Sequence, residues 1–120
     1  MSEIDEILQT MDETLLALRN ERDVLPQFQV LYRHAHTIKG LAAFCREHTM
    51  VSVCHRLEDL LQAVVEGHIV STPELKEVVA IAIDFLNSTV ASISLHYAAD
   101  IDEQAVIQRI DALLATARLH

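Results

Sequence analysis

Residues 71–97 read STPELKEVVAIAIDFLNSTVASISLHY, and this stretch decides the fold class. Thr72 or Ser71 can cap a helix, Pro73 suits a first turn, and Glu74 puts a negative charge near the positive end of the helix dipole. The apolar residues that follow recur at spacings of three and four: Leu75, Val78, Val79, Ala82, Phe85, Leu86, Val90 and Ile93. This period predicts an amphipathic helix over residues 73–97.

The same period extends to both sides and predicts further helices over residues 2–19, 26–45, 49–66 and 101–118. Gly67 is the expected stop of the third helix, and Asp100 with Glu103 forms a capping-box-like start for the fifth. Two glycines and two prolines in 120 residues are too few for a many-stranded sandwich or barrel. We therefore predict an all-α single domain over residues 1–120, an antiparallel four-helix bundle with an additional fifth helix.

Both cysteines lie near apolar stripes, so we expect small buried thiols rather than a disulfide framework. On the second helix the predicted inward face is Leu31, Ala35, Ile38, Ala42 and Cys45, and Cys54 lies on that of the third. The amino terminus lacks the basic and apolar regions of a signal peptide, and the most apolar run, 78–86, is too short to span a bilayer. These features predict a cytoplasmic protein.

The net charge of -9 comes from 18 acidic residues against nine Lys and Arg. This balance argues against nucleic acid or an anionic membrane surface as the main partner. The bases are unevenly distributed, because six of the nine lie between residues 19 and 56, where only three acids oppose them. One stretch of an acidic chain is therefore locally basic.

The chemically unusual residues lie inside this basic stretch, in His34-Ala35-His36-Thr37-Ile38-Lys39-Gly40. His36, Lys39 and Gly40 stand at i, i+3 and i+4, so they share one helix face within a single turn. Glycine inside a helix costs about 1 kcal/mol against alanine, so Gly40 calls for a reason. A missing side chain beside His36 leaves its imidazole accessible to a bulky partner.

On the next helix His55 and Glu58, also at i and i+3, share a face. If that face lies beside His36, a carboxylate can accept a hydrogen bond from Nδ1–H and leave the Nε2 lone pair free to attack. Lys39 can then balance the charge of an incoming phosphoryl group. The set describes a histidine nucleophile for phosphoryl transfer. His34, about 200° around the helix from His36, is not the expected acceptor.

His36-Thr37-Ile38-Lys39-Gly40 followed by His55-Arg56-Leu57-Glu58-Asp59-Leu60-Leu61 resembles the histidine-containing phosphotransfer (HPt) family, especially the N-terminal domains of chemotaxis histidine kinases. The resemblance covers nearly the whole chain. It implies that His36 accepts a phosphoryl group from a histidine kinase catalytic domain and passes it to an aspartate of a response-regulator receiver domain. It also implies that Lys39 assists as a cation, Gly40 gives access, and Glu58 with His55 supports the imidazole.

In that family ATP and magnesium belong to partner domains, and this chain has no Gly-rich phosphate loop of its own. No cofactor is therefore expected here, and the chain is a phosphocarrier without an ATP site, either part of a histidine kinase or a free-standing relay carrier. We expect the isolated domain to be a monomer. After Gly40 the run 41–45 is Leu-Ala-Ala-Phe-Cys, where chemotaxis-kinase domains usually have more glycines and small residues before an aromatic. We expect a stiffer helix there and a different surface for partners.

Two other classes of function compete with phosphotransfer. A zinc site could draw on nearby His and Cys side chains, namely His34, His36, Cys45, His48, Cys54 and His55. Their spacing is poor for a metal, because neither Cys-x-x-Cys nor His-Glu-x-x-His occurs, and no metal site is predicted. A helical adaptor that is not phosphorylated is the second alternative, and it predicts binding without phosphoryl uptake.

Overall fold

The computed structural model describes residues 2–18, 24–95 and 103–118, and all regular structure in these ranges is helical. The helices are α1 (Ser2–Ala17), α2 (Leu25–Phe44), α3 (His48–Val65), α4 (Pro73–Leu95) and α5 (Glu103–Arg118). Where the predicted bounds can be compared, they agree to within two residues, and those at residues 2, 73 and 118 coincide. The predicted helical positions 19, 96–97 and 101–102, and Asp100 as a cap, lie outside the described residues.

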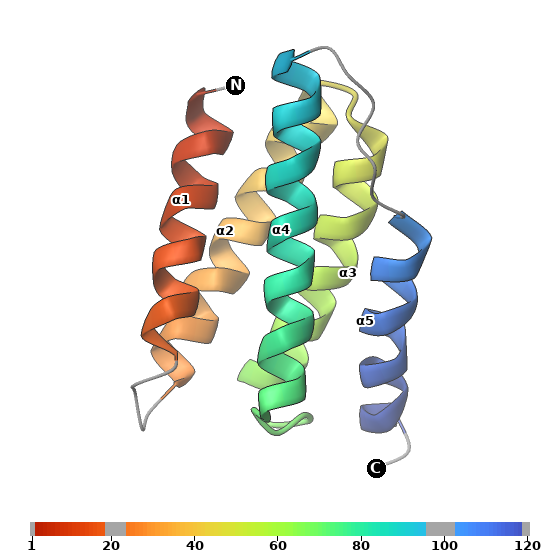
Figure 1. Ribbon diagram of the computed structural model, residues 1–120. Coiled ribbons are helices and arrows are strands. Elements are labelled where there is room, and N and C mark those ends of the chain that lie inside the picture. Colours follow the sequence, from red (N-terminus) through yellow and green to blue (C-terminus); the bar gives the residue numbers. More distant parts are fainter. Residues whose placement is uncertain (1, 19–23, 96–102, 119–120) are drawn as a thin grey trace.

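The helices α1 to α4 form a four-helix bundle in which each runs antiparallel to the one before it (Figure 1). The contacting pairs are α1 with α2 and α4, and α3 with α2 and α4. The additional helix α5 packs outside this group against α3 and α4. This arrangement confirms the predicted antiparallel bundle with a fifth helix.

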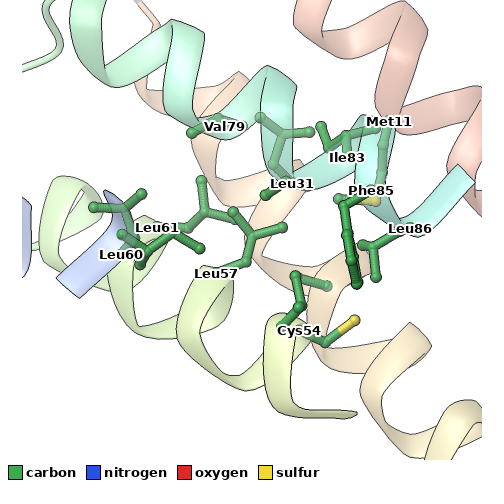
Figure 2. Close-up of a cluster of buried hydrophobic side chains, with 14 of the residues drawn as sticks. Met11, Leu31, Cys54, Leu57, Leu60, Leu61, Val79, Ile83, Phe85 and Leu86 are labelled. Carbon is green, nitrogen blue, oxygen red and sulfur yellow. The ribbon is translucent and has the colours of Figure 1, made fainter. Parts of the chain in front are cut away.

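The core lies between the four bundle helices, extends to α5, and is apolar apart from the buried Thr89 among the described residues (Figure 2). Most of the predicted inward residues are fully buried, including Leu31, Ile38 and Leu86. Phe28 and Ile83 are also fully buried, although they were not among the predicted inward residues. Phe28 fits the helical period, because it precedes Leu31 by three residues on the same face. Burial of this apolar surface is the main force that holds α2 and α3 in fixed positions.

The prediction that Cys45 lies on the buried face of α2 was wrong, because this thiol is exposed; Cys54 is buried as expected. The helix ends at Phe44, so the 3.6-residue period no longer applies at position 45. Arg46 then adopts a left-handed conformation with φ 62°. In this turn the amide of Glu47 donates to the carbonyl of Ala42 at 2.8 Å, which closes the end of the helix.

The predicted signals between α3 and α4 are confirmed by the backbone. Gly67 has φ 81°, and the amide of His68 donates to the carbonyl of Ala63 at 2.8 Å, which is the pattern of a glycine-terminated helix. Thr72 Oγ1 accepts a hydrogen bond from the amide of Leu75 at 3.1 Å, as an N-cap does. Of the helices described, none is long and apolar enough to cross a membrane.

Candidate functional site

The packing of α2 against α3 brings His36 and Lys39 together with Glu58. His36 Nδ1 lies 3.1 Å from Glu58 Oε2. Lys39 Nζ lies 2.9 Å from Oε2 and 3.2 Å from Oε1 of the same carboxylate. Only three residues, 45–47, join the two helices, so α2 and α3 run antiparallel side by side (Figure 1), and residues on their facing sides come close together. Three of the predicted site residues thus form one cluster.

The imidazole of His36 is open to solvent on one side and held on the other, since its side chain is 65% exposed. An ionised carboxylate only accepts hydrogen bonds, so the ring nitrogen that faces Glu58 is assigned as the Nδ1–H donor. The neutral ring then carries its lone pair on Nε2, the nitrogen that does not face Glu58. This is the tautomer that an attacking imidazole needs.

The carboxylate of Glu58 is far less accessible, with its side chain 12% exposed. Burial alone raises the pKa of Glu58, but the hydrogen bond from Lys39, then that from His36, and the positive charges of both act in the opposite direction. Their sum holds the pKa of this carboxyl below its ordinary value. Glu58 is therefore ionised at neutral pH and acts as a fixed hydrogen-bond acceptor.

Lys39 lies deeper than His36, with its side chain 25% exposed. Its ammonium group is bound to Glu58, whereas the sequence suggested only that it would balance an incoming charge. An ammonium has three N–H donors, so binding to two carboxylate oxygens leaves one for another acceptor. The cation thus fixes Glu58 and remains within the same cluster as the imidazole.

Gly40 lies on the exposed side of α2, one turn after His36, and a Cβ built there would meet no atom within 4 Å. Packing inside this chain therefore does not require the glycine. His55 has a partner on its own helix. Its Nε2 lies 3.7 Å from Asp59 Oδ2, and the described side chains show no hydrogen bond or ion pair between His55 and His36 or Glu58. Support of His36 by His55 stays a prediction.

Two neighbouring side chains, Cys54 and His34, are not expected to act as the nucleophile. The thiol of Cys54 is protonated at neutral pH, and His34 lies about 200° around α2 from His36. Burial and, less strongly, the charge of Glu58 raise the pKa of the Cys54 thiol, Lys39 acts in the opposite direction, and together they bring this pKa to about 12. The thiol is therefore protonated at neutral pH. His34 is partly buried, which lowers its pKa, and the charge of Arg33 lowers it as well. In the described ranges no three His, Cys, Asp or Glu side chains converge as metal ligands would.

The chain is similar in sequence to known proteins. A family model described as Hpt domain matches residues 1–118. The chain is 30% identical over 88 residues to the sensor histidine kinase CheAY of Helicobacter pylori, an alignment that covers 73% of this chain and 11% of that protein. It is 32% identical over 93 residues to the chemotaxis protein CheA of Bacillus subtilis, covering 78% of this chain and 14% of that protein. No solved structure gives a significant match.

Proposed function

The chain belongs to the Hpt domain family, whose members are histidine phosphotransfer modules of two-component signalling, and we propose that His36 carries the phosphoryl group. One observation supports this assignment most strongly. His36 is an exposed imidazole whose Nδ1 lies 3.1 Å from a largely buried carboxylate. The arrangement stabilises the nucleophilic tautomer and leaves Nε2 to react.

In the loading step the Nε2 lone pair attacks the γ-phosphorus of ATP held by a kinase domain. The new N–P bond forms as the bond from phosphorus to the bridging oxygen breaks, and the electron pair leaves with ADP. The ring becomes positively charged because Nδ1 keeps its proton. Glu58 stabilises this charge through its hydrogen bond, and the free N–H of Lys39 is available to a phosphoryl oxygen.

In the unloading step an aspartate carboxylate of a response regulator attacks the same phosphorus. An acyl phosphate forms, the N–P bond breaks, and its electron pair returns to Nε2. The Nδ1–H bond to Glu58 persists through both steps, so the site needs no proton acceptor. Catalysis here consists of orientation and charge stabilisation.

ATP and magnesium bind to the kinase partner in this proposal, and this chain contributes only the acceptor. Family membership implies a kinase and a response regulator as partners. Similarity to a chemotaxis protein favours a kinase domain of the chemotaxis class as the donor, acting in the cytoplasm. The chain spans 11% and 14% of the two relatives' lengths, so which further domains accompany it is part of the proposal.

The test uses His36→Gln with His34→Gln as the matched control from the same helix. Each protein is incubated with labelled ATP and the kinase domain of a chemotaxis-type kinase, and separately with phosphoramidate, a small phosphoryl donor to imidazole. We expect acid-labile, alkali-stable label on the wild type and on His34→Gln, and none on His36→Gln. Undiminished label on His36→Gln would refute the assignment. Stoichiometric zinc in the purified protein, measured by elemental analysis, would contradict it independently.

A further inference from the structure

Phe44 is the most exposed large apolar side chain of the described residues, at 88%. The chain has only three phenylalanines, and the other two, Phe28 and Phe85, are buried in the core. An aromatic ring left in water is unfavourable by the hydrophobic effect, and aromatic residues are enriched at the energetic centres of protein interfaces. Nothing in the bundle itself requires this ring on the surface.

The position of Phe44 links it to the phosphoacceptor. It follows His36 by eight residues on α2, so it lies about 12 Å along the helix and about 80° around it. Gly40 lies midway between them, and Ala43 beside it is also exposed. The direct line along α2 from His36 to Phe44 therefore passes the small exposed residues Gly40 and Ala43 between an imidazole and a phenyl ring. A protein surface that reaches Nε2 across Gly40 can reach Phe44 as well.

Charge indicates the nature of the protein that contacts this surface. Residues 25–44 contain no Asp or Glu, and of their two bases Lys39 is paired with Glu58 while Arg33 is exposed, whereas α1, α3, α4 and α5 all carry acidic residues in this chain of net charge -9. A partner that offers an aspartate as acceptor presents negative charge to α2. Such charges are attracted by this helix and repelled by the remaining surface.

We infer that Phe44 is the docking anchor for the receiver domain of a response regulator, in an interface that runs along α2 from His36. The inference rests on the proposed function of His36. Where a kinase domain shares a polypeptide with its acceptor, it already has a high effective concentration, so a receiver that diffuses freely gains more from such an anchor. Buried under the partner, the ring supplies apolar area, and Gly40 lets the partner approach His36 closely.

The experiment compares Phe44→Ser with Val70→Ser. Val70 is the matched control, since it is 77% exposed and lies between α3 and α4, at the opposite end of the bundle from Phe44. Each protein is loaded with phosphoramidate, and transfer to a receiver domain is followed at increasing receiver concentrations. We expect Phe44→Ser to lower the second-order rate constant at least about tenfold through weaker binding. In Phe44→Ser we expect the maximal transfer rate and the loading by phosphoramidate to stay unchanged. We expect Val70→Ser to match the wild type in all three quantities.

Equal transfer kinetics for Phe44→Ser and Val70→Ser would overturn the inference. It is also overturned if Phe44→Ser slows loading by a kinase domain but not transfer to the receiver, because the ring would then anchor the kinase. Phe44→Leu keeps apolar area and should restore most of the rate, which separates docking from a general effect on folding. Absence of label on the wild-type protein after phosphoramidate treatment would instead refute His36 as acceptor, and this inference with it.

Discussion

At the scale of single residues, Glu58 is the group on which both cations of the cluster converge. We predict that Glu58→Ala leaves the bundle folded but slows phosphorylation of His36 about 10- to 100-fold, the usual effect of removing the partner that orients a functional imidazole. The reason is that Nδ1 loses its acceptor, so the two tautomers become comparably populated and the charge on the phosphorylated ring is unsupported. The initial rate of labelling by a kinase domain measures this effect.

Asp59→Ala is the matched control for this variant. Asp59 is the next residue on α3 and contacts His55 instead of His36. An equal loss of rate in both variants would show that general negative charge, not the contact with Nδ1, is what matters.

The lowered pKa of Glu58 also has a consequence for stability. Its ionised form contributes fully above the unfolded-state pKa, and this contribution is lost as the pH falls through the lower, folded pKa.

Gly40 illustrates a conflict between stability and access. We predict that Gly40→Ala raises the free energy of unfolding by about 0.5–1 kcal/mol, because alanine is the better helix residue and its Cβ meets no atom within 4 Å. The same change should slow loading by a kinase domain and leave loading by phosphoramidate unaltered, since only a macromolecule needs the cleared surface. Urea unfolding and the two labelling rates measure these effects.

A stabilised Gly40→Ala variant with unchanged kinase loading would contradict the role in access.

The residue-scale features differ in how far sequence could predict them. The contact of His36 with Glu58 was predictable, because helical spacing places each on a definite face. The binding of Lys39 to the same carboxylate was not, since a long side chain can reach several acceptors and its choice depends on the distance between α2 and α3.

At the scale of helices, sequence predicted the elements well and their ends less well. The apolar period identified α1 to α5, and Gly67 and Thr72 marked termini that the backbone confirms. The error at Cys45 arose because the period was extended one residue beyond the last helical turn. The end of α2 could not be predicted from Arg46, because the left-handed conformation that this residue adopts is usually taken by glycine or asparagine and rarely by a basic residue.

This turn provides a prediction for the end of α2. Arg46→Gly should stabilise the protein by about 0.5–1 kcal/mol, because glycine has no Cβ to disfavour a φ of 62°. Arg46→Ala removes the same charged side chain but keeps the Cβ, so it should give no such gain. Urea unfolding of both variants at constant pH and salt measures the difference. Equal stability of the two variants would show that the turn stores no strain.

At the scale of the whole molecule, the bundle was predictable from composition and period, but the position of α5 was not. Short connections imply antiparallel neighbours and leave open which surface a fifth helix covers. In the structure α5 packs on α3 and α4, on the side away from α1, where Ile110 and Leu114 are buried. The surface of α2 that carries His36 and Phe44 is thereby left free of the fifth helix.

The excess of negative charge is also a property of the whole molecule. The described ion pairs between helices other than the His36 cluster are long and exposed, such as Arg56 with Asp111 at 3.8 Å and Arg109 with Glu77 at 3.9 Å, so they contribute little. Like charges also meet. Burial raises the pKa of Asp12, a hydrogen bond from Asn87 lowers it, and the charge of Asp84 raises it. Repulsion should therefore outweigh attraction among the surface charges.

We predict that salt stabilises this protein. Two of its dimensions are 27 and 23 Å, less than the Debye length of about 30 Å at 0.01 M salt, so most charges interact there. At about 0.2 M that length is below 10 Å, and the repulsion is largely screened. The free energy of unfolding in urea should rise by on the order of 0.5 kcal/mol between these conditions. Asp84→Asn should show a smaller rise in the free energy of unfolding with salt. A fall in the free energy of unfolding of the wild-type protein with salt would mean that the ion pairs dominate.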